Sequence, residues 1–140
     1  MGQQQLLLVI LVTIIVGIAT VVALNVFGTQ AEQANEDAVR QDMMSGAATA
    51  QGYYMRPTNM GGGGGEFDDI DLDDLNIPGV TQDDADDEDA GNENATGWSV
   101  EGAGDVLTIT ATGVQTGEDH EGVLDRDASS GEWEFTFDDE

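Results

Sequence analysis

The chain has 140 residues and no cysteine, which allows about one domain and excludes disulfides and thiol chemistry. It has 29 Asp and Glu residues but only three Arg and no Lys, so the formal net charge is -26 at pH 7. This charge repels nucleic acid and anionic lipid, and neither is expected as a partner. The missing Lys and abundant Asp are most simply interpreted as adaptation to high salt, which screens the self-repulsion.

An uncharged, apolar block occupies residues 6–24 (LLLVILVTIIVGIATVVAL), and the first charged side chain is Glu32. At 1.5 Å per residue this block spans about 28 Å as a helix, close to the roughly 30 Å core of a bilayer. A secretory signal peptide needs a cationic start, which is missing. A simple membrane anchor usually carries Lys or Arg at one end. Two interpretations remain, a lipid anchor and a helix that leaves the membrane for a bundle of identical helices.

Small and hydroxyl-bearing side chains favour the bundle, because helices can approach closely at Thr13, Gly17, Ala19 and Thr20. The residues predicted to mediate assembly are Met1, Gln5, Leu6, Ile10, Ile14, Gly17, Ile18, Val21 and Leu24.

The helical pattern continues well beyond the apolar block, in two offset stripes. Larger residues recur at Val39, Met43, Ala47, Ala50 and Tyr54. Small residues recur at Ala31, Ala34, Ala38, Ser45, Ala48 and Gly52. We expect the larger stripe to lie under a folded head and the small stripe to face neighbouring helices.

Two local sequence signals support a helix in this polar half and define where it ends. Glu36 and Arg40 stand four positions apart with the acid first, the favourable order for a helical ion pair. Arg56-Pro57 ends the helix, because the residue before proline avoids the α region.

A Gly-rich and acidic segment follows. The five glycines 61–65 predict a flexible hinge or, alternatively, a backbone that approaches another segment closely, such as a neighbour's helix. No Lys-Ser or Lys-Thr follows them, so a phosphate-binding loop is excluded. Asp69, Asp71 and Asp73 have the first spacings of a calcium loop, but the rest of that motif fails. They remain weak metal candidates for Ca²⁺ or Mg²⁺, and solvated acidic loops, including residues 83–89, are the favoured interpretation.

Apolar residues should attach this segment to the head, namely Phe67, Ile70, Leu72, Leu75 and Ile77. Asn94-Ala95-Thr96 is a weak candidate glycosylation site at Asn94.

From Gly97 onward the hydrophobic period becomes two, which predicts half-buried strands. The inward residues are Trp98 and Val100, then Leu107, Ile109 and Ala111, then Val123, and finally Trp133, Phe135 and Phe137. Turns are expected at 102–104, 117–120 and 129–131, and such short connections favour an antiparallel meander of about four strands.

The predicted fold is therefore α+β: a long N-terminal helix (about residues 2–55) with a small antiparallel sheet packed on its C-terminal half. We divide it into an apolar transmembrane or filament-core half (1–28), an amphipathic half (29–56), a Gly- and Asp-rich linker (57–96) and a β head (97–140).

No catalytic residues, cofactor or enzymatic activity are predicted. His120 is expected in a solvent-exposed turn and has no Cys or Ser motif to form a nucleophile pair. An active-site carboxylate needs a structured pocket, and these acids fall in loops and outward strand positions.

These features resemble a type IV pilin or pilin-like filament subunit. The apolar start MGQQQLLLVILVTIIVGIATVVAL, the amphipathic AEQANEDAVRQDMMSGAATAQGYYMRP and the strands after Gly97 match that architecture over the whole length, although only the first 25 or so positions are diagnostic. The resemblance implies a processed chain with an N-methylated Met1. The family usually has a glutamate where this chain has Gln5, so the implied pairing of that carboxylate with a neighbour's terminal amine is altered. An archaeal-type filament protein is a weaker neighbouring match.

The resemblance implies a structural protein: a homo-oligomeric, extracellular filament at the cell surface, whose subunits sit in the inner membrane before assembly. The alternative is a single-pass, membrane-anchored acidic binding module that holds divalent cations or a surface ligand.

Overall fold

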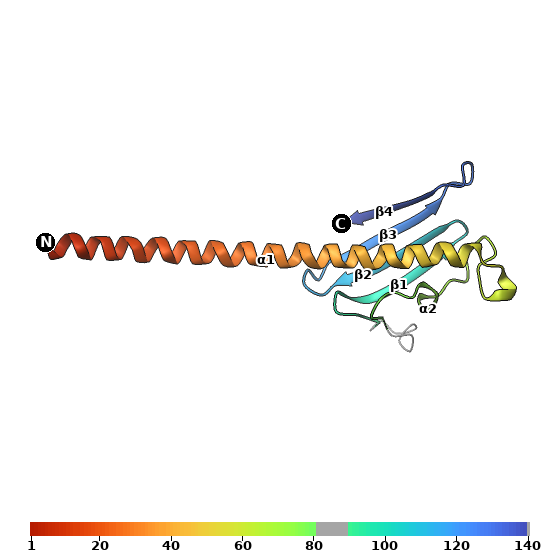
Figure 1. The fold of residues 1–140 in the computed structure, drawn as a ribbon, viewed down its shortest axis with the longest axis horizontal. Helices are drawn as coiled ribbons and strands as arrows, with labels where there is room; N and C mark the ends of the chain where they lie inside the picture. Colours follow the sequence, from red (N-terminus) through yellow and green to blue (C-terminus); the bar gives the residue numbers. More distant parts are fainter. Residues whose placement is uncertain (81–89, 140) are drawn as a thin grey trace. The chain divides into compact units, whose positions relative to one another are not determined.

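The computed structural model describes residues 1–80 and 90–139 and begins with one long helix, α1 (Gly2–Met55). The helix ends directly before Arg56-Pro57, as the proline rule predicts. A 3₁₀ turn, η1 (Thr58–Met60), and a short helix, α2 (Leu72–Leu75), follow. Four strands complete the chain: β1 (Ala95–Ala103), β2 (Val106–Gly113), β3 (Asp119–Arg126) and β4 (Trp133–Asp139). The predicted α+β fold is confirmed (Figure 1).

The contacts divide the chain into two compact units, Met1–Ala34 and Asn35–Glu140. The boundary falls inside α1, so the first unit is helix alone. The second unit contains the rest of α1 and all four strands.

The four strands of the second unit form one antiparallel sheet in the order β1-β2-β3-β4. Each strand is joined to the next by a short turn, so the sheet is the expected meander. Gly104 has a φ of 59° in the β1–β2 turn, a left-handed conformation that favours glycine. In the register, Leu107 pairs with Leu124, which in turn pairs with Phe135.

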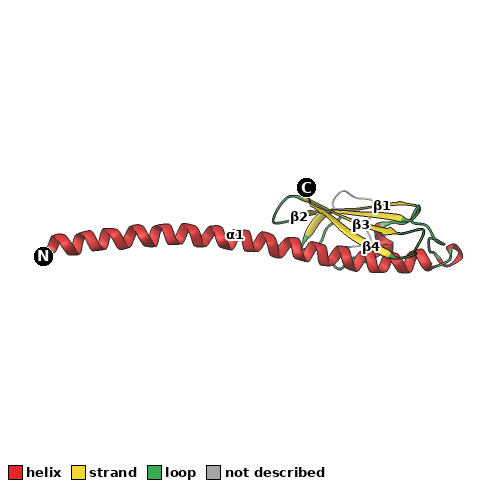
Figure 2. Cartoon of the chain, turned by 90° about the horizontal axis from the view of Figure 1, so that it is seen from above, coloured by secondary structure: helices red, strands yellow, loops and turns green. Residues whose placement is uncertain are grey.

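The core of the second unit lies between the inner face of this sheet and α1, which form two layers (Figure 2). The larger stripe of the helix is buried as predicted, namely Val39, Met43, Ala47, Ala50 and Tyr54. The sheet contributes Trp98, Leu107, Ile109, Ala111 and Leu124. The acidic segment adds Phe67, Ile70, Leu72, Leu75 and Ile77, all buried as expected. The predicted acidic run 83–89 lies outside the described residues.

The five glycines fold back on the end of α1, so the hinge prediction is wrong. The amides of Gly63 and Gly65 donate to the carbonyls of Tyr53 and Tyr54, at 3.0 and 2.9 Å. The amide of Gly64 donates to the carbonyl of Arg56 at 2.9 Å. Carbonyls at a helix C-terminus have no partner within the helix, and here the glycine amides bond to them together with the Arg56 amide, which donates to the Tyr53 carbonyl at 3.1 Å. The alternative prediction was that the glycine backbone approaches another segment closely. It does so, but the segment is the chain's own helix and not a neighbour's.

Glycine is required there by space as well as by conformation. A Cβ on Gly63 would lie 1.9 Å from the carbonyl oxygen of Glu66, and a Cβ on Gly62 would lie 2.3 Å from that of Arg56. Gly64 and Gly65 have positive φ values of 66° and 102°. The segment therefore forms a tightly packed cap on the C-terminus of α1, and side chains would not fit at its centre.

Two predictions about β3 are also wrong. His120 was expected in an exposed turn, but it is 4% exposed and lies on the inner face of β3. The strand begins earlier than expected because the Gly113 amide donates to the Glu118 carbonyl and the Thr112 hydroxyl donates to Asp119. Starting from His120, the inward positions are the even ones, so Leu124 and not Val123 is buried in the core.

Candidate functional site

The first unit presents an apolar helix with nothing packed on it. Every residue from Met1 to Ala34 is exposed within the chain. The large apolar side chains between Leu6 and Phe27 each expose between 49% and 68% of their surface. α1 is long and apolar enough to cross a membrane, and none of its most apolar window is buried. A helix that is apolar on all sides needs lipid or protein around it.

The hydroxyl groups in this helix are satisfied internally. Thr13 donates to the carbonyl of Val9 at 2.7 Å, and Thr20 donates to that of Val16 at 2.8 Å. Such bonds to the residue four positions back are the usual way for Thr to sit in an apolar helix. The hydroxyl donors are thus already used, which lowers the free-energy cost of placing this surface in an apolar environment.

All the predicted assembly residues lie on this uncovered surface, from Met1 and Gln5 to Leu24. The positions from Leu6 to Leu24 recur every three or four residues, which places them along one side of the helix, but within the chain that side is as exposed as the others. A Cβ placed on Gly17 would meet nothing within 4 Å, so this position is open to a neighbouring surface. Assembly through these residues stays a prediction.

In the second unit, α1 uses its two stripes differently. The larger stripe is buried under the sheet, whereas Ala48 and Gly52 of the small stripe are exposed and Ser45 is half-buried. The predicted ion pair between Glu36 and Arg40 forms at 2.6 Å. The helix therefore keeps a face of small side chains that the core of this unit does not use.

The weak metal candidates do not form a site. Asp69, Asp71 and Asp73 are all exposed. The backbone amide of Asp71 donates to the carboxylate of Asp74 at the start of α2, and the backbone carbonyl of Asp69 accepts from the Tyr53 hydroxyl at 3.1 Å. Within residues 1–80 and 90–139, no group of three His, Asp or Glu side chains could hold a metal ion.

A buried polar cluster, missed by the sequence analysis, joins α1 to the start of β1. Asp42 is 9% exposed and accepts from the side-chain amides of Asn92 and Asn94, at 2.8 and 2.9 Å. Asn35 donates to the Asn94 carbonyl at 2.7 Å and accepts from the Gln115 amide at 3.1 Å. The candidate glycosylation nitrogen of Asn94 thus has a structural role, and its glycosylation stays a prediction.

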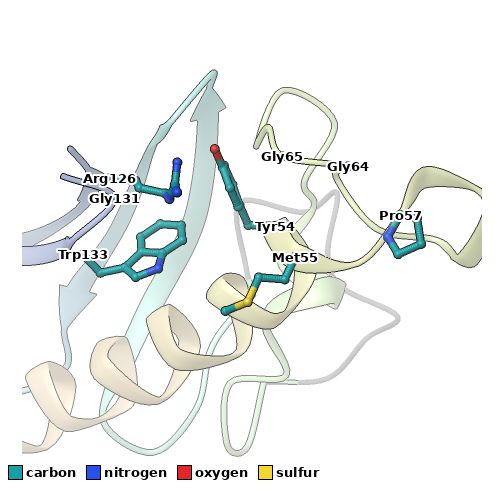
Figure 3. A pocket seen from close by; sticks show the side chains of 8 residues that line it. All are labelled: Tyr54, Met55, Pro57, Gly64, Gly65, Arg126, Gly131 and Trp133. Carbon is teal, nitrogen blue, oxygen red and sulfur yellow. The ribbon is translucent and has the colours of Figure 1, made fainter. Parts of the chain in front are cut away.

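A pocket of about 570 Å³ lies in the second unit, between the end of α1, the glycine segment and the β3–β4 hairpin (Figure 3). The guanidinium carbon of Arg126 is 5.4 Å from the ring centre of Tyr54 and 5.9 Å from that of Trp133. The two rings meet edge to face, with centres 5.1 Å apart. These contacts hold the cation against aromatic faces, a favourable arrangement for Arg.

Two carboxylates near this pocket have partners of their own. The Tyr54 hydroxyl donates to Asp105, and this hydrogen bond raises the pKa of Tyr54. Asp127 accepts from the side chain of Ser129 and from the amides of Ser129 and Ser130, at 2.6 and 2.9 Å for the amides. These bonds lower the pKa of Asp127 to about 2, because they stabilise its charged form.

No protein-family model matches this chain, and no curated protein or solved structure is significantly similar to it.

Proposed function

We propose that the chain is the structural subunit of an extracellular, type IV pilus-like filament, with apolar helices bundled in its core and acidic heads outside. The observation that carries the proposal is the uncovered helix of the first unit. Burying one large aliphatic side chain is worth about 1.5–3 kcal/mol, so a helix with this many exposed ones gains some tens of kcal/mol by leaving water. Such a surface is kept only if something outside the chain covers it.

The surface of the second unit supports the proposal that other copies of the chain cover this apolar helix. Its core buries the larger stripe of α1, leaves Ala48 and Gly52 exposed and leaves Ala38 and Ser45 half-buried. A helix that only carried a membrane anchor would have no need of such a face. Small residues let helices approach closely and gain van der Waals contact, in a filament core as in a membrane.

The acidic surface supports an outward-facing head in salty surroundings. The net charge is -26, and most of the Asp and Glu side chains in the described part of the chain are exposed. Lowering the salt from about 1 M to about 0.01 M lengthens the Debye screening distance from about 3 to about 30 Å. The melting temperature of the second unit should fall on this dilution, and an unchanged value would contradict adaptation to salt.

The experiment is negative-stain microscopy of material sheared from cells that express the chain. We expect filaments of uniform width that contain it. Replacing Gly17 and Ala19 together by Leu should reduce filament yield, because the larger side chains hold neighbouring helices apart. The matched control replaces Leu8 and Leu11 by Ile, which keeps volume and apolarity, and should leave the yield unchanged.

A chain that stays monomeric in detergent, with no filament on cells at high salt, would contradict the proposal. It would favour the alternative of a membrane-anchored acidic binding module. Equal filament yield from the Leu double variant and the Ile control would contradict close helix contacts at Gly17 and Ala19.

A further inference from the structure

Arg126 is the sole basic residue after Arg56, in a stretch that holds 25 of the 29 acids. It is half-buried and lies in the pocket against Tyr54 and Trp133. Figure 3 shows its side chain beside Tyr54 and next to Trp133. In so acidic a chain, a guanidinium is expected to pair with a carboxylate of its own chain.

Arg126 makes no such pair. Over residues 1–80 and 90–139, the ion pair that forms within 4.0 Å is Glu36 with Arg40. Asp105 and Asp127, which lie near the pocket, bond to other groups, Asp105 to the Tyr54 hydroxyl and Asp127 to Ser129 and Ser130. The Arg126 guanidinium itself interacts with the Tyr54 hydroxyl. Its fork has five N–H donors and is suited to bidentate binding of a carboxylate, so further donors face the open pocket.

We propose that this pocket binds a carboxylate side chain of a second copy of the chain. Charge complementarity selects this occupant: each copy offers 29 acidic side chains, and this pocket holds its one Arg after position 56. The aromatic walls reduce the exposure of the ion pair to water, and partly buried pairs are screened by salt much less than exposed ones. The inference rests on the proposed function, because filament assembly is what brings the copies together.

The absence of lysine makes a direct test available. The variant Arg126→Lys carries the chain's single side-chain amine, held at the pocket. A carbodiimide joins an amine to a carboxylate only when they are in contact, so treatment of sheared filaments should produce covalent dimers. Peptide mapping of the dimers by mass spectrometry should place one end of the amide at position 126 and identify the acid of the other copy.

The matched control is Gln115→Lys, which places the same amine on an exposed residue of the turn between β2 and β3, at the other end of the sheet. It should give few dimers. As a second measurement, Arg126→Gln should lower the temperature at which sheared filaments dissociate, while Gln115→Lys should not.

Several outcomes would overturn the inference while leaving the filament intact. One is that Arg126→Lys filaments form but give only amides within one chain, to Asp105 or Asp127. A second is that glutarate, a dicarboxylate without an amine, raises the melting temperature of the wild-type chain but not that of Arg126→Gln while no dimers appear, which would identify a small-molecule site. If the wild-type chain forms no filaments, the proposed function fails first and this inference falls with it.

Discussion

The two units of this chain differ in how much of their apolar surface is buried. Met1–Ala34 exposes all of its apolar side chains, whereas Asn35–Glu140 buries most of its described large apolar side chains in a core of helix and sheet. The first unit contains one charged side chain, Glu32, and the second contains the other 28 acids. The second unit can thus be understood from its internal contacts, and the first requires surroundings that the chain does not supply.

The largest expected effect is on the core of the second unit alone. Phe67 is fully buried, with ring centres 5.0 Å from Tyr54 and 5.9 Å from Trp133. The variant Phe67→Ala should lower the free energy of unfolding by about 3–5 kcal/mol, because it leaves a cavity among these rings. Denaturant unfolding of the full chain in detergent, followed by tryptophan fluorescence, measures this loss. A parallel loss of membrane association would break the comparison between the units.

A second substitution changes the first unit and leaves the core of the second unit untouched. A Lys in the middle of a membrane-spanning helix costs about 2.5–3.5 kcal/mol on insertion, so Ile14→Lys should shift the chain out of the membrane fraction and abolish filaments. The control Ile14→Leu keeps size and apolarity and should behave as wild type. Unfolding of the second unit should be unchanged in both. Filaments formed at the wild-type level by Ile14→Lys would show that residue 14 is not in an apolar environment.

A smaller effect is expected at the glycine cap. In Gly63→Ala the new Cβ would collide with the carbonyl of Glu66, and the displacement should cost about 1–3 kcal/mol of unfolding free energy. The matched control is Gly52→Ala on exposed helix, where a Cβ meets nothing within 4 Å. It should stabilise by about 0.5–1 kcal/mol, because alanine suits a helix better than glycine. Equal effects of the two variants would mean that the cap is not tightly packed.

The smallest effect depends on pH and concerns the loop between β3 and β4. The pKa of Asp127 falls from 3.8 to about 2 on folding, so its contribution is present above pH 4 and is lost as the pH falls toward 2. The melting temperature of wild type should therefore exceed that of Asp127→Ala near neutral pH, and the difference should shrink below pH 4. Molar salt should be present in both, to screen the other carboxylates. A difference that is constant down to pH 2 would contradict the role of the charge.

The sequence predicted the fold well where one strong signal decided each element. The residue before Pro57 ends α1, and the buried stripe from Val39 to Tyr54 follows the helical period. The strands follow from alternation, because one sheet face is buried and the other is not. These signals are local, and a single chain is enough to observe them.

The errors arose where a distant contact decides the conformation. Gly63 belongs to a cap because its amide donates to the Tyr53 carbonyl, ten residues earlier in the chain. His120 enters β3 because Gly113 pairs with Glu118 across the turn, which moves the strand start and sets which residues face inward. The Arg126 pocket gave no local signal at all, since its walls come from α1 and from two strands.

The glycine cap bears on the proposed adaptation to high salt. Helix C-termini are commonly complemented by Lys or Arg, whose attraction to the carbonyl end weakens as ions accumulate. Here neutral backbone amides meet those carbonyls, and neutral donors lose little strength to added ions. This end of the helix should hold equally well in dilute buffer and in concentrated salt, while the acidic surface around it does not.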